Sequence, residues 1–172
     1  YNPNNPRHTY KSAAVTNLFY MNNVIHDVLY HYGFDEAAGN FQVNNYGRAP
    51  VGSGLPGDDV RAEAQDGGGL NNANFFTPPD GSRPRMQMFL WNTANPFIDG
   101  DFDNGIIAHE YGHGISNRLV GGASISGCLQ NEEQMGEGWS DWYTLMFSID
   151  SGDTETEIRG IGTFAVNQPT NG

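Results

Sequence analysis

The stretch IIAHEYGHGISNRL, residues 106–119, contains the side chains whose spacing most directly indicates chemistry. His109, Glu110 and His113 form the pattern His-Glu-x-x-His. On a helix, residues four apart share one face, so the two imidazoles can bind a single metal ion. Glu110 lies one step around the helix, near the open side of the metal, where it can take a proton from a water molecule. The pattern predicts a zinc site with Glu110 as the general base.

A third metal ligand is expected from the segment NEEQMGEGWSDWYTLMF, residues 131–147. A catalytic zinc ion has three protein ligands and one open position, and Glu132, Glu133 and Glu137 compete for the third. Glu137 has Asp141 four residues later on the same helical face. An aspartate there can accept the free N–H of a ligating histidine and so fix its tautomer. This spacing favours Glu137 as the ligand, with Glu133 second.

The stretch DGDFDNGIIAHE, from Asp99 to Glu110, offers a competing site for Ca²⁺. Its acidic residues occupy positions 1, 3, 5 and 12 of a calcium-binding loop. However, position 6 is Asn104 where such a loop needs glycine, and position 12 is the glutamate that the zinc pattern uses. We therefore interpret Asp101 and Asp103 as acidic residues that favour the N-terminus of the active-site helix, with Ca²⁺ binding as the alternative.

Helices and strands must position these side chains. The spacing of apolar residues predicts helices at 11–32, 103–120 and 131–148, and a last short helix within 154–166. Alternating or β-prone runs predict strands at 41–48 and 58–65, an edge strand Ala73–Phe76 and a returning strand Arg85–Trp91. The order of elements indicates an α+β fold with a mixed or antiparallel sheet.

The packing of two helices can also be predicted. Trp139, Trp142, Leu145 and Met146 are expected to anchor the third-ligand helix in the core. Gly112 and Gly114 lie within the active-site helix, where each glycine costs up to about 1 kcal/mol relative to alanine. We expect that these glycines allow another element to pack closely against this helix.

The composition limits the classes of function. With 172 residues, the chain can form one domain with a core. Its net charge of −12 argues against nucleic acid or an anionic membrane as partners, and it has no apolar run of the about 18 residues that a membrane span needs. The single cysteine, Cys128, cannot form an internal disulfide. The chain starts without Met and stops in polar coil, which suggests a piece of a longer, processed protein.

The sequence resembles zinc metallopeptidases of the fungalysin family, within the thermolysin-like gluzincins. The resemblance rests on HEYGHGISNRL and GEGWSD, together with RMQMFLW and NNVIHDVLYHYGF, and it spans nearly the whole chain. It implies a thermolysin-like zincin fold in which His109, His113 and Glu137 bind zinc. It also implies that Glu110 is the catalytic base and that Asp141 supports a ligand. Residues 1–172 would then form one partial catalytic domain.

The resemblance further implies where substrate and partners bind. The segment NNANFF resembles the edge strand that pairs with the substrate backbone, which makes Asn72 and Ala73 candidate substrate contacts. Family members are secreted as precursors with an inhibitory propeptide. Their helical C-terminal part supplies the groups that stabilise the oxyanion. We expect that part to be largely absent from this chain, so it and the propeptide are expected partners.

The predicted function is a secreted zinc endopeptidase that acts on proteins or peptides through a zinc-activated water. One alternative is a zinc aminopeptidase of the wider gluzincin group, although such enzymes place the third ligand after a gap shorter than the 23 residues between His113 and Glu137. Another is a fragment that binds zinc but is inactive without its missing half. A calcium-binding adhesion module would use Asp99–Asp103 and leave the histidines free of metal.

Overall fold

A computed structural model describes residues 10–168 of the chain. The helices are α1 (Lys11–His31), α2 (Asn104–Val120) and α3 (Gly136–Phe147), with short 3₁₀ turns η2 (Glu36–Ala38) and η3 (Gly100–Phe102). The strands are β1 (Arg61–Glu63), β2 (Ala73–Phe76), β3 (Arg85–Met88), β4 (Leu90–Trp91) and β5 (Ile98–Asp99). The architecture is therefore mixed α+β, as the sequence predicts.

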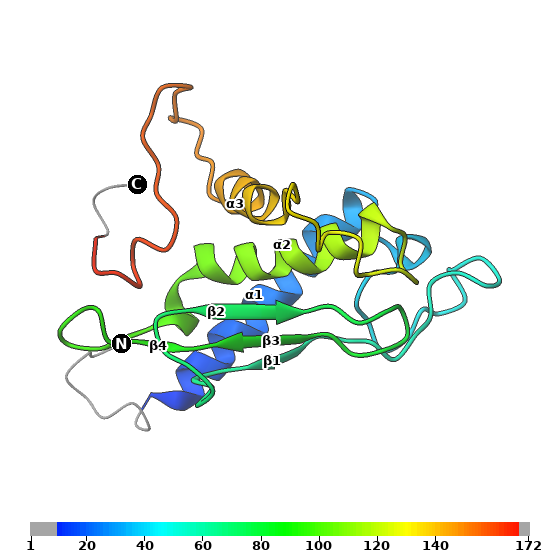
Figure 1. The fold of residues 1–172 in the computed structure, drawn as a ribbon, viewed down its shortest axis with the longest axis horizontal. Helices are drawn as coiled ribbons and strands as arrows, with labels where there is room; N and C mark the ends of the chain where they lie inside the picture. Colours follow the sequence, from blue (N-terminus) through cyan, green and yellow to red (C-terminus); the bar gives the residue numbers. More distant parts are fainter. Residues whose placement is uncertain (1–9, 169–172) are drawn as a thin grey trace.

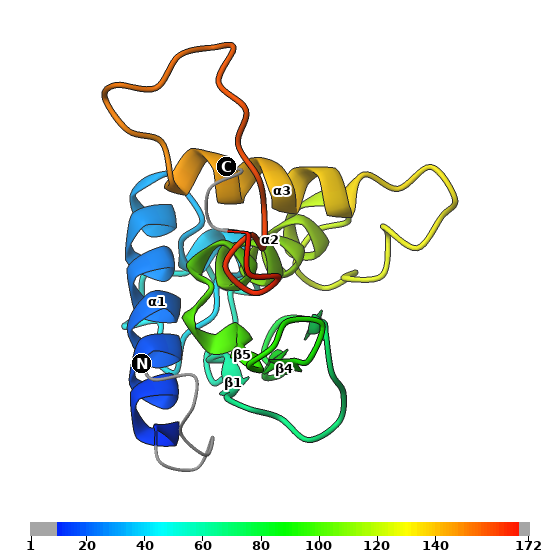
Figure 2. The same cartoon turned by 90° about the vertical axis from the view of Figure 1, so that its left-hand side faces the viewer.

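Helix α2 is central to the fold. Figure 1 shows it between the sheet on one side and α3 on the other, and Figure 2 shows α1 beside it. The sheet has the order β1-β3-β2, in which β1 is parallel and β2 is antiparallel to β3. Strand β2 thus lies at an edge, with one side unpaired in the described part of the chain. The predicted mixed sheet with an edge strand at Ala73–Phe76 is confirmed.

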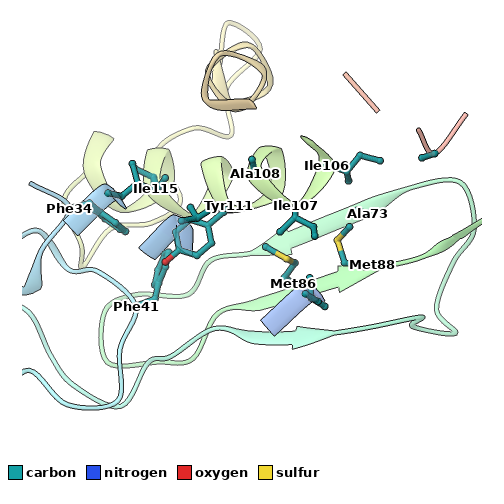
Figure 3. Close-up of a cluster of buried hydrophobic side chains, with 14 residues drawn as sticks. Phe34, Phe41, Ala73, Met86, Met88, Ile106, Ile107, Ala108, Tyr111 and Ile115 are labelled. Atoms are coloured by element: carbon teal, nitrogen blue, oxygen red, sulfur yellow. The ribbon is translucent and has the colours of Figure 1, made fainter. Parts of the chain in front are cut away.

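The core fills the space between α2 and the sheet. Met86 and Met88 from β3 face Ile107 and Tyr111 from α2, and all four side chains are buried (Figure 3). Burial of each such large apolar side chain stabilises the fold by about 1.5–3 kcal/mol before the cost of ordering it. The same contacts fix the face of α2 that is turned away from the sheet.

Helix α1 confirms the first predicted helix and ends one residue early. Its buried face consists of Ala14, Leu18, Asn22, Ile25 and Leu29. Val15 and Phe19, which share the predicted apolar periodicity, are exposed instead, and the side chain of Phe19 is 70% exposed. None of the described helices has both the length and the apolar character needed to cross a membrane.

Three predicted elements are wrong or too long. No strand forms at 41–48, because the side chains of Asn44 and Asn45 bond to nearby backbone groups and Tyr46 has a positive φ of 50°. The strand predicted at 58–65 is limited to β1. The predicted strand Arg85–Trp91 is divided between β3 and β4, which belong to different sheets.

The last two predicted helices also differ from the structure. Helix α3 begins at Gly136 rather than 131, because the side chain of Gln134 accepts the backbone N–H of Gly136 at 2.7 Å and holds the preceding residues in a turn. Residues 154–166 form turns and not a helix. Gly162 has a φ of +69°, a conformation that interrupts a helix, and the backbone N–H of Ala165 donates to Asp103 of the α2 N-terminus.

The acidic stretch before α2 does not form a twelve-residue calcium loop, because the helix begins at Asn104 inside it. Asp103 is the N-cap and accepts the backbone N–H groups of Gly105 and Ile106, as predicted for an acidic helix start. Asp101 instead accepts the backbone N–H of Gln65, which precedes the sheet strands β2 and β3, at 2.9 Å. These two aspartates therefore serve different elements.

Asp99 and Asp101 form a buried carboxyl pair. Gln65 Nε2 donates to Asp99 Oδ2 at 2.7 Å, and the backbone N–H of Asp101 donates to Asp99 Oδ1 at 3.0 Å. Burial, followed by the hydrogen bond to Asp99 and by its charge, raises the pKa of Asp101 to about 9. A proton held between the two carboxyl groups satisfies Oδ1 of Asp101, which has no other partner among the described residues.

Asp101→Asn is expected to make the stability of the fold less dependent on pH. Because the folded state retains a proton that the unfolded state loses above about pH 4, this group stabilises the fold most at low pH. The stabilisation declines as the pH rises toward 9, by up to about 1.4 kcal/mol per pH unit. The amide imitates the protonated acid but does not ionise. The melting temperature of the variant should therefore rise relative to that of the wild type as the pH increases from 5 to 9. Parallel curves would contradict the shared proton.

Candidate metal centre

Helix α2 presents His109, Glu110 and His113 from two successive turns. The Asp103 cap fixes the N-terminus of α2, and the core fixes the face that packs on the sheet. The two histidines therefore project on the side of α3. The rings are 4.8 Å apart between centroids and meet at 82°. The spacing of four residues therefore places both imidazoles at one point, as the sequence predicts.

Helix α3 approaches α2 closely because both helices carry small residues where they meet. A Cβ atom on Gly112 would lie 2.9 Å from Cα of Ser140, and Thr144 donates its hydroxyl to the carbonyl oxygen of Gly105 at 2.8 Å. On the other side of α2, a Cβ on Gly114 would lie 2.7 Å from the Phe75 ring. The expected close packing at both glycines is confirmed.

This packing corrects the predicted core face of α3. The buried residues of the helix are the small Gly136, Ser140 and Thr144. Trp142 is 55% exposed and Met146 is also exposed, so neither anchors the helix in the core as predicted. A large side chain at the α2 contact would push apart two helices whose backbones nearly touch at Gly112.

The approach of α3 places Glu137 against both histidines. Nε2 of His109 lies 3.1 Å from Nε2 of His113, and Oε2 of Glu137 lies 3.0 Å and 3.3 Å from these two nitrogens. Four-coordinate zinc has ligand distances of about 2.0–2.2 Å, which separates neighbouring ligand atoms by about 3.3 Å. The three atoms therefore form a triangle of the size that zinc requires. Among the described residues, this is the one group of three that could hold a metal ion.

The protonation of the histidines suits metal binding. Nδ1 of His109 lies 2.8 Å from Asp141 Oδ1, so the tautomer that donates its Nδ1 proton to Asp141 presents the lone pair of Nε2 to the triangle. Burial lowers the pKa of His113, which favours its neutral form, although the charge of Glu137 opposes this shift. Facing lone pairs and a carboxylate repel one another without a cation, so the donor set fits a bound metal.

Glu110 is the buried acid of the site. It is 5% exposed, and its Oε2 has no hydrogen-bond partner among the described residues. Burial, followed by the charge of Glu137, raises the pKa of Glu110 to about 8. A positive ion on the three ligands would act in the opposite direction. The carboxyl group thus lines the same groove as the three candidate ligands.

A groove of about 490 Å³ runs past these residues. One wall is residues 72–77, which include the candidate substrate contacts Asn72 and Ala73. The lining also includes residues that we did not predict from the sequence: Asn117, Ser126, Leu129, Gln130 and Gln134. The position of Asn117 four residues after His113, on the same helical face, is a signal that could have identified it.

Gly112→Ala is expected to separate α3 from α2 and to weaken metal binding. The added methyl group would contact the Ser140 backbone, and overpacking of this kind costs about 1–3 kcal/mol. A shift of α3 also moves Glu137 away from the histidines, and misplacement by about 1 Å costs on the order of 100-fold in rate. Thermal unfolding, metal titration and peptide hydrolysis would measure the three effects.

The matched control is Gly138→Ala in α3. Apart from its chain neighbours and the backbone of its own helix, nothing in the described structure lies within 4 Å of a Cβ at Gly138, so alanine should stabilise this helix by up to about 1 kcal/mol and leave metal binding unchanged. If Gly112→Ala behaved like this control, the close approach of α2 and α3 would not be needed to form the site.

An α+β fold in which two helices bring two histidines and a glutamate together beside a groove is consistent with a metallopeptidase domain. Comparison with known proteins agrees, because the model of the fungalysin metallopeptidase family (M36) matches residues 1–172. The chain belongs to the fungalysin metallopeptidase family.

Individual relatives carry corresponding names. The chain is 50% identical over 166 residues to extracellular metalloproteinase 4 of Trichophyton tonsurans, covering 95% of this chain and 25% of that protein. It is 49% identical to the proteins of the same name from Arthroderma gypseum and Trichophyton soudanense, again over 95% of the chain, and covers 25% and 41% of them. The chain therefore spans less than half of the length of these relatives.

Proposed function

We propose that this chain carries the catalytic centre of a secreted zinc endopeptidase that hydrolyses peptide bonds in proteins. The observation that supports this most directly is the triangle of His109 Nε2, His113 Nε2 and Glu137 Oε2, with edges of 3.0–3.3 Å. A zinc ion bound there supplies a Lewis acid that polarises the scissile carbonyl and lowers the pKa of water. The names of the relatives support secretion and protein substrates.

Glu110 has the position of the general base in this proposal. Its carboxylate lines the groove and can accept a proton from the water that attacks the carbonyl carbon, and can then donate that proton to the leaving amine. Asp141 holds the His109 ring in the tautomer that leaves Nε2 unprotonated. Glu110 is 5% exposed, so its carboxyl group has little contact with bulk water that could compete for the proton.

We further propose that substrate binds in extended form along β2. The unpaired edge of this strand lines the groove, and its backbone groups can add a peptide as a further strand. Asn72 and Ala73 are the proposed contacts nearest the start of the strand. In this proposal, residues 1–172 form part of one thermolysin-like domain, and the propeptide and a C-terminal part of the precursor act with it.

Metal removal tests the proposed function. The full-length protein should contain about one zinc ion per polypeptide, lose peptide hydrolysis when treated with a zinc chelator, and regain it with added Zn²⁺ but not with Ca²⁺. Peptides blocked at both ends should be cleaved internally, which separates an endopeptidase from an aminopeptidase. Activity that survives complete removal of the metal, or that requires a free N-terminus, would reject the proposal.

A further inference from the structure

Strand β2 is joined to α2 at the end of the groove. The side-chain Nδ2 of Asn117 donates to Oγ1 of Thr77, the residue that follows β2, at 3.0 Å. Both residues line the groove, and Thr77 is buried. Since Asn117 lies one helical turn after His113, this bond connects the substrate-binding strand directly to the helix that carries two metal ligands.

A second connection lies behind the first. The Arg118 side chain is 0% exposed and donates from Nε to the carbonyl oxygen of Pro78 at 3.1 Å and from Nη1 to Asp80 at 3.2 Å. Nη1 also donates to the buried Asp58 at 3.0 Å. Buried ion pairs of this kind are poor evidence for stability, but they fix geometry because a partner left unpaired is costly. Arg118 thus anchors the turn after β2 to the same helix.

We propose that Asn117 is a positioning residue for the substrate-binding edge of β2, with Arg118 as the anchor behind it. This inference rests on the proposed function. Strand β2 has the β3 ladder on one side and, within residues 10–168, no paired strand on the other. The bond from Asn117 therefore holds the end of the strand at a defined place relative to the metal ligands.

The distance along α2 between His113 and Asn117 determines which substrates depend on this hydrogen bond. Four residues of helix rise about 6 Å, and an extended peptide advances about 3.3 Å per residue, so the bond lies about two substrate residues from His113. A peptide long enough to pair along β2 depends on the place of the strand. A dipeptide derivative held at the metal does not reach it. Asn117 should therefore affect the binding of long peptides selectively.

The test measures peptide affinity in full-length, zinc-loaded protein carrying Glu110→Gln, so that turnover is not required. The probes are a fluorescent, doubly blocked hexapeptide and a doubly blocked dipeptide. Asn117→Ala and Thr77→Val should each weaken hexapeptide binding by about 3–10-fold, the range for one hydrogen bond, and the double variant by no more than either one. Dipeptide affinity and zinc content should stay unchanged, and amide exchange at residues 73–77 should become faster.

Two further variants sharpen this test. Asn117→Asp should restore hexapeptide affinity to within about 2-fold, because the Thr77 hydroxyl can donate to the new carboxylate. Asn23→Ala is the matched control, since Asn23 lies in α1 and donates to the Phe19 carbonyl oxygen away from the groove. This variant should leave the affinities for both peptides and the zinc content unchanged.

Several outcomes would overturn the positioning role. Additive losses in the double variant would make Asn117 and Thr77 independent contacts, and no rescue by aspartate would point to direct contact between the Asn117 amide and substrate. Equal losses for both peptides, loss of zinc, or unchanged hexapeptide affinity would also reject it. Failure of the proposed function gives a different result, in which the wild-type protein binds no zinc or cleaves no blocked peptide.

Discussion

Glu110→Gln should abolish peptide hydrolysis and leave the zinc content unchanged. The amide has nearly the same shape as the carboxyl group but cannot accept a proton at neutral pH, and general-base catalysis contributes about 100- to 10,000-fold to such reactions. Glu110 is not part of the ligand triangle, so the metal should remain bound. Metal analysis together with cleavage of a doubly blocked peptide measures both effects.

This variant should also fold normally. The side chain is buried and one of its oxygens has no partner among the described residues, so an amide of the same volume loses no hydrogen bond to Oε2. Removing a carboxyl group whose pKa is raised to about 8 also removes the cost of ionising it in the core. A zinc-loaded Gln variant that hydrolyses peptides at the wild-type rate would reject Glu110 as the base.

The sequence predicted helix α2 well because its signals are local. The spacing of His109 and His113 fixes a shared helical face, and Asp103 provides an acidic cap at the start of α2. The strand Ala73–Phe76 was also predicted with its observed limits, since a β-prone run ends at a turn rich in Pro and Gly. Local chemistry was sufficient in each of these cases.

The parts that were missed depend on contacts between distant segments. The buried face of α3 is set by its close approach to Gly112, which no pattern within α3 reveals. For this reason Trp142, a large apolar residue, was wrongly placed in the core. The hydrogen bond between Asn117 and Thr77 joins residues 40 positions apart, so it depends on the fold and not on a pattern within either segment.

Glu137→Gln should cause the largest loss of metal. A neutral amide is a much weaker ligand for zinc than a carboxylate, and its –NH₂ group would face two imidazole nitrogens if the side chain turned over. Removal of only an outer hydrogen-bond partner typically costs about 10–100-fold in metal affinity, so loss of a direct ligand should exceed that range. Competition with a chelator of known zinc affinity measures the change, and hydrolysis should fall with zinc occupancy.

Glu133→Gln is the matched control, because Glu133 is the other acidic candidate from the same segment. It is exposed and its Oε2 accepts a hydrogen bond from Asn131 at 3.1 Å, whereas the Glu137 carboxylate touches both histidines even though it is 68% exposed. Each variant removes one negative charge from the same segment of the chain, so a difference between them reports coordination and not net charge. Equal zinc affinity in the two variants would mean that Glu137 is not a ligand, and the assignment of the whole triangle would fail with it.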